Sequence, residues 1–459
     1  MNILIVGNGF DLSHYLPTKY DHFMDVMGSI EKKNTGEKAK DLSIHTVDEW
    51  IIEIDKNFHE REGGSQFNYQ MSFDELFSQT LDPEFIEKTK ECYLTNEIEL
   101  SAKDVLKLQY RLKLNCWYQY FKKHVNDIKT WIDFEQKIEE VLLSFVNVIP
   151  FIEQINGKSE YAFPLRTFEN TVGKRNILVL DSFHIFENKG MHKGFNTQFC
   201  YGRNDKNGMN PSSFLEFTYK QLEEFIEIFN LYLEIIVGQL SQSKIIDIHA
   251  EWSYPDKIFS FNYTNTYQRL HDSVAVEYLH GSCGEHQNIV LGVSDLESES
   301  LKKVKAYGFT KYQQKLFKDT DYLFLDEYKN FIERNKRVLE ENLKLLSANA
   351  LNEIRVKAAR AKSISQESSL DLNFYIWGHS LDVSDKDYII DIFSLNDDID
   401  RNVRVTVYYF NKPAKFSLLN NLLAILGKDK VEQWMKNKWL QFKENPEVRF
   451  IESESQQIA

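Results

Sequence analysis

The sequence predicts an α/β fold in which a largely parallel sheet is interrupted by two large helical insertions. A short apolar run at residues 3–6 leads directly into Gly7-Asn8-Gly9, which is typical of a buried strand that ends in a tight turn. Strand-like runs return later in the chain and alternate with helical patterns, as in β-α-β units. Two long stretches have helical periodicity instead, and we expect these to be insertions.

The predicted strands are short apolar runs. They cover residues 3–6, 176–180, 257–261, 276–279, 288–291, 372–377 and 403–410. Helical patterns at 214–240 and 388–393 separate several of these runs, so neighbouring strands are expected to be parallel. The predicted α/β core therefore comprises residues 1–30, 172–297 and 370–459.

The first predicted insertion covers residues 31–171. Between residues 102 and 150 the pattern is mostly helical, and Phe134, Ile138 and Phe145 recur at helical spacing on one apolar face. Glu135 lies beside this face and is expected to be solvated. The second insertion, 298–369, is long and charged, which favours a helical insertion or a helical hairpin that stands off the sheet.

Composition limits the classes of function. The 459 residues are 42% hydrophobic and 27% charged, as in soluble globular proteins. A net charge of -14 repels a phosphate backbone, so nucleic acid is not the expected partner. The four cysteines form no C-x-x-C pair, and neither a disulfide framework nor a metal site is expected. No signal peptide or apolar run of about 20 residues is present, so we expect a cytoplasmic protein without a membrane partner.

Polar residues directly follow four of the predicted strands. They are Asn8, Asn262, His280 and the triplet Gly378-His379-Ser380. In an open parallel sheet, ligands bind outside the carboxyl ends of the strands, where such side chains converge. The sequence therefore predicts a nucleotide-binding crevice in which His280 lies beside Gly7-Asn8-Gly9.

The glycine loop is suited to phosphate binding, because its backbone N–H groups can approach an anion closely. Its pattern is incomplete as a dinucleotide fingerprint. Leu12 occupies the place of the third glycine, and no acidic residue closes a second strand about 20 residues later. A hydride-transfer enzyme is therefore not expected, and a strand-to-helix turn without a ligand remains an alternative.

His280 is the candidate general base, because imidazole titrates near neutral pH. A structural histidine is the alternative. His379 competes for the same role, or with Ser380 could cap the helix that begins near Ser384-Asp385. Asp11 could stabilise a developing positive charge or bind a ribose hydroxyl, and its alternative is a helix cap.

Several stretches resemble the AbiH family of bacterial abortive-infection proteins. They are GNGFDLSHYLPTKYDHF, WIDFE, FSFNYTNT, HGS followed by NIVLG, and FYIWGHSLDVSDKDY. The resemblance implies defence against bacteriophage through self-limiting damage or dormancy of the infected cell. It also implies a phage-derived trigger of unknown identity and assembly into homo-oligomers.

The same strand ends are more distantly similar to the sirtuins, which implies a Rossmann-like, sirtuin-like sheet that takes NAD as substrate or ligand. The sirtuin G-A-G-x-S with its later Gly-Ile-Pro is similar to Gly7-Asn8-Gly9 with Leu16-Pro17, and its Gln-Asn-Ile-Asp is similar to Phe261-Asn262-Tyr263-Thr264. Its His-Gly is similar to His280-Gly281 and its Gly-Thr-Ser-Leu to Gly378-His379-Ser380-Leu381, while Asn411 matches the asparagine that ends its next strand.

The residue patterns and the resemblance together give two sets of site residues. The catalytic set is His280, Asn262 and Asp11. The cofactor-binding set is Gly7, Asn8, Gly9, Pro17, Thr264, Gly378, His379, Ser380 and Asn411. The sirtuin Asp-Phe-Arg is replaced by Thr18-Lys19-Tyr20 and the zinc cysteines are missing, so lysine deacylation is not expected.

Two functions remain open at this point. One is an NAD glycohydrolase that breaks the nicotinamide-ribose bond. The other is a non-enzymatic module that senses a nucleotide and signals to a partner or an oligomer, with His280 as a ligand contact. Transfer chemistry on another nucleotide or on nucleic acid is a third option, which the acidic charge disfavours.

Overall fold

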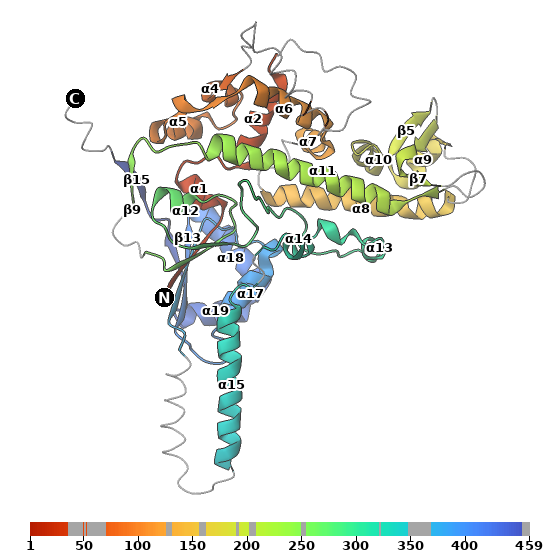
Figure 1. The fold of residues 1–459 in the computed structure, drawn as a ribbon. Coiled ribbons are helices and arrows are strands. Elements are labelled where there is room, and N and C mark those ends of the chain that lie inside the picture. Colours follow the sequence, from red (N-terminus) through yellow and green to blue (C-terminus); the bar gives the residue numbers. More distant parts are fainter. Residues whose placement is uncertain are drawn as a thin grey trace, which may run out of the picture. The chain divides into compact units, whose positions relative to one another are not determined.

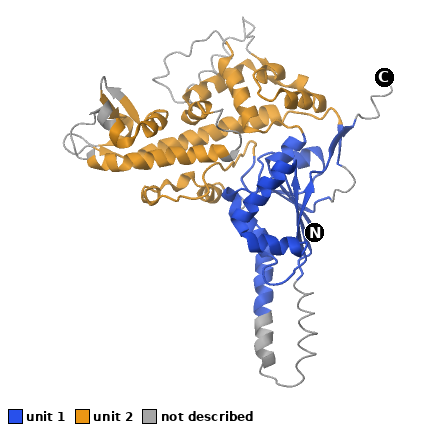
Figure 2. Cartoon of the chain, turned by 180° about the vertical axis from the view of Figure 1, so that it is seen from behind, with its two compact units in different colours: residues 1–14, 245–282, 319–459 blue, residues 15–244, 283–318 orange. Residues whose placement is uncertain are grey.

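The computed structural model describes residues 1–34, 49, 52, 70–124, 131–155, 162–189, 192–201, 208–248, 254–320, 323–347 and 369–451. The chain divides into two compact units, coloured separately in Figure 2. The sheet unit consists of Met1–His14, Ile245–Ser282 and Asp319–Ala459. The helical unit consists of Tyr15–Lys244 and Cys283–Lys318.

A six-stranded sheet organises the sheet unit (Figure 1). Its spatial order is β11 (Val276–Tyr278), β10 (Lys257–Ser260), β1 (Asn2–Val6), β12 (Leu372–Trp377), β13 (Val403–Tyr409) and β14 (Leu440–Glu444). Every neighbouring pair is parallel. When the strands are numbered as they occur along the chain, this order is 3-2-1-4-5-6. The order reverses between β1 and β12, and the carboxyl edge at such a reversal is where open parallel sheets commonly bind ligands.

Both faces of the sheet are covered, because the side chains of β1 alternate between two cores. Ile3 and Ile5 belong to one core, and Leu4 and Val6 belong to the other. The first face packs against α17 (Lys386–Ser394), α18 (Lys412–Leu426), α19 (Lys428–Lys436) and the start of α15 (Asp326–Ser347). The second packs against α1 (Asn8–Ser13) and α12 (Thr266–Leu270). The unit also contains η5 (Val383–Asp385) and the antiparallel pair β9 (Ile245–Ile248) and β15 (Val448–Ile451).

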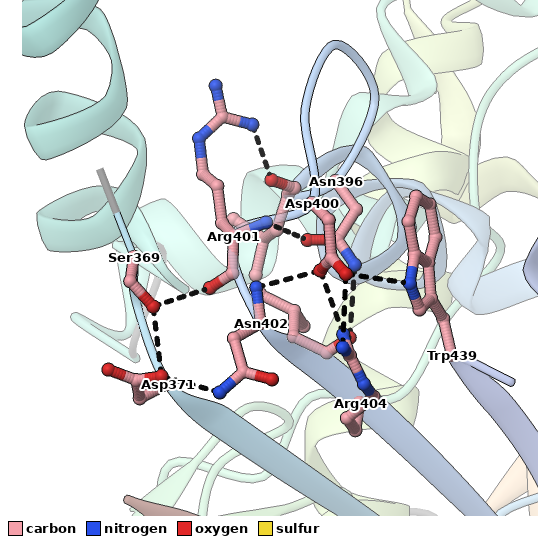
Figure 3. Close-up of polar contacts among 10 residues, drawn as sticks. Ser369, Asp371, Asn396, Asp400, Arg401, Asn402, Arg404 and Trp439 are labelled. Atoms are coloured by element: carbon pink, nitrogen blue, oxygen red, sulfur yellow. Dashed lines mark hydrogen bonds and ion pairs between the residues drawn. The ribbon is translucent and has the colours of Figure 1, made fainter. Parts of the chain in front are cut away.

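A polar network fixes the turns at the amino edge of the sheet (Figure 3). The buried Arg401 guanidinium donates to the carbonyl of Leu395 at 2.7 Å, and its backbone N–H donates to Asn396 Oδ1 at 3.0 Å. Asp400 accepts from Arg404 at 2.9 Å and from the indole of Trp439 at 3.2 Å. This network ties the turn before β13 to the start of β14, at the edge away from the predicted site.

The helical unit is built around aromatic packing. Its helices are α2 (Tyr20–Lys32), α4 (Phe73–Leu76), α5 (Pro83–Cys92), η1 (Thr95–Glu97), α6 (Ala102–Leu114), α7 (Cys116–Lys122), α8 (Trp131–Ile155), α9 (Leu165–Val172), α10 (Lys174–Asp181), η2 (Thr197–Phe199), α11 (Pro211–Tyr232), η3 (Leu233–Val237), α13 (Glu299–Lys303), η4 (Ala306–Phe309) and α14 (Lys311–Phe317). Its short strands are β2 (Met71–Ser72), β3 (Glu99–Leu100), β4 (Ala162–Pro164), β5 (Phe186–Lys189), β6 (His192–Phe195), β7 (Cys200–Tyr201) and β8 (Gly208–Met209). Phe134 lies 3.9 Å from Phe121 and 5.1 Å from Phe225, measured between ring centroids. The predicted apolar face of α8 is therefore confirmed, since Phe134, Ile138 and Phe145 are all buried.

Most of the predicted core strands are confirmed, and two of the predicted strands are wrong. The runs at 3–6, 257–261, 276–279, 372–377 and 403–410 correspond to β1, β10, β11, β12 and β13. The run at 176–180 lies in α10, because a short apolar run fits either periodicity and Gly173, with φ of 88°, precedes a helix here. The edge strand β14 was not predicted, because its alternating residues are half exposed.

The run at 288–291 is buried but is not a strand. The side-chain amide of Gln314 makes hydrogen bonds to this run that a neighbouring strand would otherwise make. Its Oε1 accepts from the N–H of Leu291 at 3.0 Å, and its Nε2 donates to the carbonyl of Leu291 at 2.9 Å. A single side-chain amide thus satisfies backbone groups that would otherwise require a β-ladder.

The two units divide the chain differently from the predicted domains. Residues 172–244 and 283–297, expected in the α/β core, belong to the helical unit, and residues 319–369 belong to the sheet unit. Within 172–244, the run at 176–180 forms part of α10 rather than a core strand, and the helix predicted at 214–240 corresponds to α11 and η3. Glu135 is also not solvated as expected, since its carboxylate is 13% exposed and lies 2.8 Å from the buried ammonium of Lys311. Ser363-Ile364-Ser365, a turn-like cluster near the end of the second predicted insertion, lies outside the described residues.

Candidate functional site

The loops after β1 and β12 pack directly against each other through glycines. The N–H of Gly7 donates to the carbonyl of Trp377 at 3.1 Å, and that of Gly9 donates to the carbonyl of Gly378 at 2.9 Å. A Cβ on Gly7 would lie 2.6 Å from the Cα of His379, and one on Gly378 would lie 2.0 Å from the N of Phe10. Gly378 also has φ of +75°, which L-residues rarely adopt. Glycine is thus required here for backbone packing at the point where the strand order reverses.

Asn262 joins the end of β10 to this contact. Its Nδ2 donates to the carbonyl of Gly7 at 2.9 Å, and its own N–H donates to Ser260 Oγ at 3.1 Å. The side chain is buried, so the amide is held in a single orientation. Three of the four predicted strand ends therefore meet through hydrogen bonds and close backbone contact.

Asp11 is a buried carboxyl group on α1. The hydroxyl of Thr264 donates to its Oδ2 at 2.7 Å, and the hydroxyl of Thr266 donates to that of Thr264 at 3.0 Å. Its Oδ1 is buried and has no hydrogen-bond partner within the part of the chain that the structure describes. Burial raises the pKa of Asp11 to about 6, although the hydrogen bond from Thr264 and the nearby charge of Arg269 both favour the ionised form.

Two histidines neighbour Asp11 on the same side of the sheet. The Nδ1 of His14 lies 2.8 Å from the carbonyl of Phe10, and its Nε2 lies 2.8 Å from the Nε2 of His271. A carbonyl only accepts, so His14 donates from Nδ1 and its Nε2 accepts from His271. Burial lowers the pKa of His14 to about 3 and that of His271 to about 4, so both rings are neutral at physiological pH. The sequence did not predict this pair.

His280 and His379 face a shared acid, Asp385. The Nε2 of His280 lies 3.2 Å from Asp385 Oδ1, and the Nε2 of His379 lies 3.3 Å from Asp385 Oδ2. The ring of Phe261 packs against both imidazoles, with centroids 5.1 Å and 4.0 Å away. The loops after β11 and β12 are therefore joined by one buried carboxylate.

The predicted residues thus form two clusters on opposite faces of the sheet. The Asp11 cluster lies with Phe10 on the α1 and α12 side. The His280 cluster lies with Phe261 on the α17 side. The glycine contact connects them at the carboxyl edge, because Asn262 bonds to Gly7, whose backbone touches that of His379.

The remaining predicted residues have varied positions. Asn8 and Thr264 are half-buried, and Ser380 is exposed with its carbonyl accepting from Asn421 at 3.0 Å. Asn411 caps α18, since its Oδ1 accepts the N–H of Ala414 at 2.8 Å. Pro17 lies in the helical unit, where its carbonyl accepts from the hydroxyl of Tyr232 at 2.5 Å.

Asp385 is the residue that sequence reasoning missed. It was considered only as part of a helix cap, to which His379 and Ser380 were expected to contribute. In the structure, the cap is the side chain of Asp382, which accepts the N–H of Ser384 at 2.9 Å. The sequence feature that could have identified Asp385 is a carboxylate a few residues beyond the His379 turn, at the start of the next helix.

Three further observations concern the described residues outside these clusters. No group of three or more His, Cys, Asp or Glu side chains among them is arranged to hold a metal ion. A cavity of about 520 Å³ in the helical unit, lined by residues of α8 and α10 that include Asp133, Glu140 and Arg175, contains none of the predicted site residues. Across the described ranges, no helix combines the length and apolar character needed to cross a bilayer.

The family model described as bacteriophage abortive infection AbiH matches residues 3–409. The matched range includes every predicted site residue except Asn411. No curated protein and no solved structure matched the chain.

Proposed function

The chain belongs to the AbiH family, which implies a function in bacteriophage abortive infection, and on that premise we propose that it binds and hydrolyses NAD. The proposed ligand site lies at the carboxyl edge of the sheet, beside the packed loops after β1 and β12. Breaking the nicotinamide-ribose bond would deplete NAD in the infected cell. The loss of this cofactor provides a direct route from nucleotide binding to arrest of the cell.

The strand order is the observation that best supports a nucleotide site. A parallel sheet of order 3-2-1-4-5-6 is the arrangement of Rossmann-like folds, which bind dinucleotides where the order reverses. The glycine loop, Asn262 and the His379 turn all meet at that point. The sirtuin-like form of this core, and with it the choice of NAD, depends on the similarity of the strand ends.

The proposed chemistry assigns a role to each cluster. The bond from C1′ of the ribose to the pyridinium nitrogen breaks, and its electron pair leaves with nicotinamide. Water adds to C1′ and loses a proton to His280, while Asn262 orients the water or a ribose hydroxyl. Asp11 stabilises the positive charge that develops on the sugar, and its buried Oδ1 carries charge that no described donor neutralises.

The proposed phosphate contacts lie around the glycine loop. The N–H groups of Gly7 and Gly9 are already bonded to the β12 loop, so these residues would contribute close backbone approach rather than donors. Asn8, Gly378 and Ser380 are accessible at the same edge. A dinucleotide bound there would lie across the sheet edge and could reach both clusters.

Nicotinamide release from NAD by the purified chain tests this function. We expect His280→Ala to lower the rate by about 10²- to 10⁴-fold, the usual contribution of a general base. His286→Ala is the matched control, because His286 is an exposed histidine that was not assigned to the site. Near-normal release by His280→Ala would exclude the assigned role. Tight NAD binding without release by the wild type would favour the nucleotide-sensing alternative.

A further inference from the structure

Asp385 contacts both histidines of the candidate site, and it has no role in the chemistry above. Its side chain is 10% exposed, and those of His280 and His379 are 7% and 5% exposed. In such surroundings a charged carboxylate is stable only when its oxygens face donors. Each oxygen here faces one imidazole nitrogen.

The backbone determines which nitrogen of His379 carries the proton. The N–H of Leu381 donates to Nδ1 of His379 at 3.0 Å. A neutral imidazole that accepts at Nδ1 must carry its proton on Nε2. The Nε2–H of His379 is therefore directed at Asp385 Oδ2. Leu381 donates this hydrogen bond from a left-handed backbone conformation, with φ of 54°. This conformation is unfavourable for an L-residue, so the surrounding turn must stabilise it.

We propose that Asp385 is a positioning residue that selects the catalytic tautomer of His280. His379 holds one carboxylate oxygen, and the other oxygen accepts the Nε2–H of His280. The lone pair of the neutral His280 ring then lies on Nδ1, and this is the nitrogen that takes the proton from water. The proposal rests on the hydrolysis proposed above, because it assumes that His280 acts as the base.

The packing around the three side chains supports a fixed arrangement. Phe261 meets the His280 ring edge-on at 87° and lies against His379, and Tyr388 packs against Phe261 with centroids 5.2 Å apart. Asp385 sits where η5 leads into α17, a turn capped by Asp382. The contact between His280 Nε2 and Asp385 Oδ1 lacks hydrogen-bond geometry, and the contact between His379 Nε2 and Asp385 Oδ2 is long for a hydrogen bond. Such contacts commonly tighten when ligand binds.

The variant Asp385→Asn provides a specific test, because an amide has one accepting oxygen and one donating NH₂ group. It can accept an N–H from only one of the two imidazoles. His379 cannot move its proton to Nδ1 without losing the bond from Leu381, so His280 must change. We expect the variant to carry the His280 proton on Nδ1, which removes the basic nitrogen.

Two measurements follow from this expectation. NMR of the full chain labelled with ¹⁵N-histidine, near pH 8 and assigned with His280→Gln and His379→Gln, should show Nε2–H for both rings in the wild type. In Asp385→Asn, His280 alone should change to Nδ1–H. If the wild type releases nicotinamide, kcat should fall by about 10²- to 10⁴-fold in this variant, with little change in KM.

The control is Asp382→Asn, which removes a nearby carboxylate and keeps an effective helix cap. It should leave the tautomers and the rate unchanged. An Nδ1–H His280 in the wild type would overturn the proposal even if Asp385→Asn did not fold. An unchanged His280 tautomer in the folded variant would also overturn it. A wild type that releases no nicotinamide would contradict the hydrolysis, while the tautomers would still decide the role of Asp385.

Discussion

At the scale of single residues, Asp11 has a property that a purely structural carboxylate would not need. It is fully buried, and one of its oxygens has no donor among the described residues. Its pKa in the folded chain is raised from 3.8 to about 6 by burial. A group whose pKa rises on folding binds protons more tightly in the folded state. Its contribution to stability is therefore lost as the pH rises from the unfolded-state pKa through the folded-state pKa.

The expected consequence is that Asp11→Asn makes the chain's stability less dependent on pH. The wild type should lose about 2 kcal/mol between pH 4.5 and 7.5 through this carboxyl group, and the variant should not. Urea unfolding of both proteins at the two pH values measures the difference. If the stability of the wild type and of Asp11→Asn depended on pH in the same way, burial would not raise the pKa of Asp11.

The residue scale also shows what sequence could predict about the site. Asn262, Gly7 and Gly378 were predicted to converge because each follows a strand, and they do meet. Asp385 was missed because its role depends on a turn that places it between two other loops. Asn411 also follows a strand, but in the structure its side chain caps α18. An asparagine after a strand is suited both to ligand binding and to helix capping, so its position alone does not distinguish the two roles.

At the scale of elements, β1 and β12 are joined by a contact that tolerates no side chain. A Cβ on Gly378 would lie within 2.0 Å of the N of Phe10 and would require φ of +75°. The left-handed conformation costs about 1–2 kcal/mol, and overpacking adds about 1–3 kcal/mol. The glycine loop therefore cannot shift without separating the two strand ends that define the site.

We expect Gly378→Ala to destabilise the chain by about 2–5 kcal/mol and to reduce nucleotide binding. Gly28→Ala is the control, because a Cβ there meets nothing within 4 Å and alanine favours α2 by about 0.5–1 kcal/mol. Calorimetry of both variants checks the prediction. If Gly378→Ala unfolded at the same Tm as the wild type, the loops would not need this close approach.

Most of the short apolar runs were correctly predicted as strands, and two were not. The strand β12 was predicted with its bounds, because five of its six residues are apolar or aromatic. The runs at 176–180 and 288–291 have similar composition, but one forms α10 and the other pairs with Gln314. These outcomes depend on distant residues and could not be read from local periodicity.

At the scale of the whole molecule, the chain leaves the sheet unit twice from the carboxyl edge. It enters the helical unit after His14 and again after Ser282, next to residues of the candidate site. Both helical segments are therefore continuous in sequence with the site loops. The predicted insertions have boundaries that differ from those of the two units.

The most direct test of the central claim is a thermal-shift measurement with NAD, comparing the wild type with Asn262→Ala. A ligand at 100 times its Kd stabilises the folded state by about 2.7 kcal/mol, which raises Tm by several degrees. The account predicts this rise in the wild type and its loss in Asn262→Ala, with each shift taken relative to the same protein without ligand. No shift in the wild type at millimolar NAD, or an equal shift in both proteins, would contradict it.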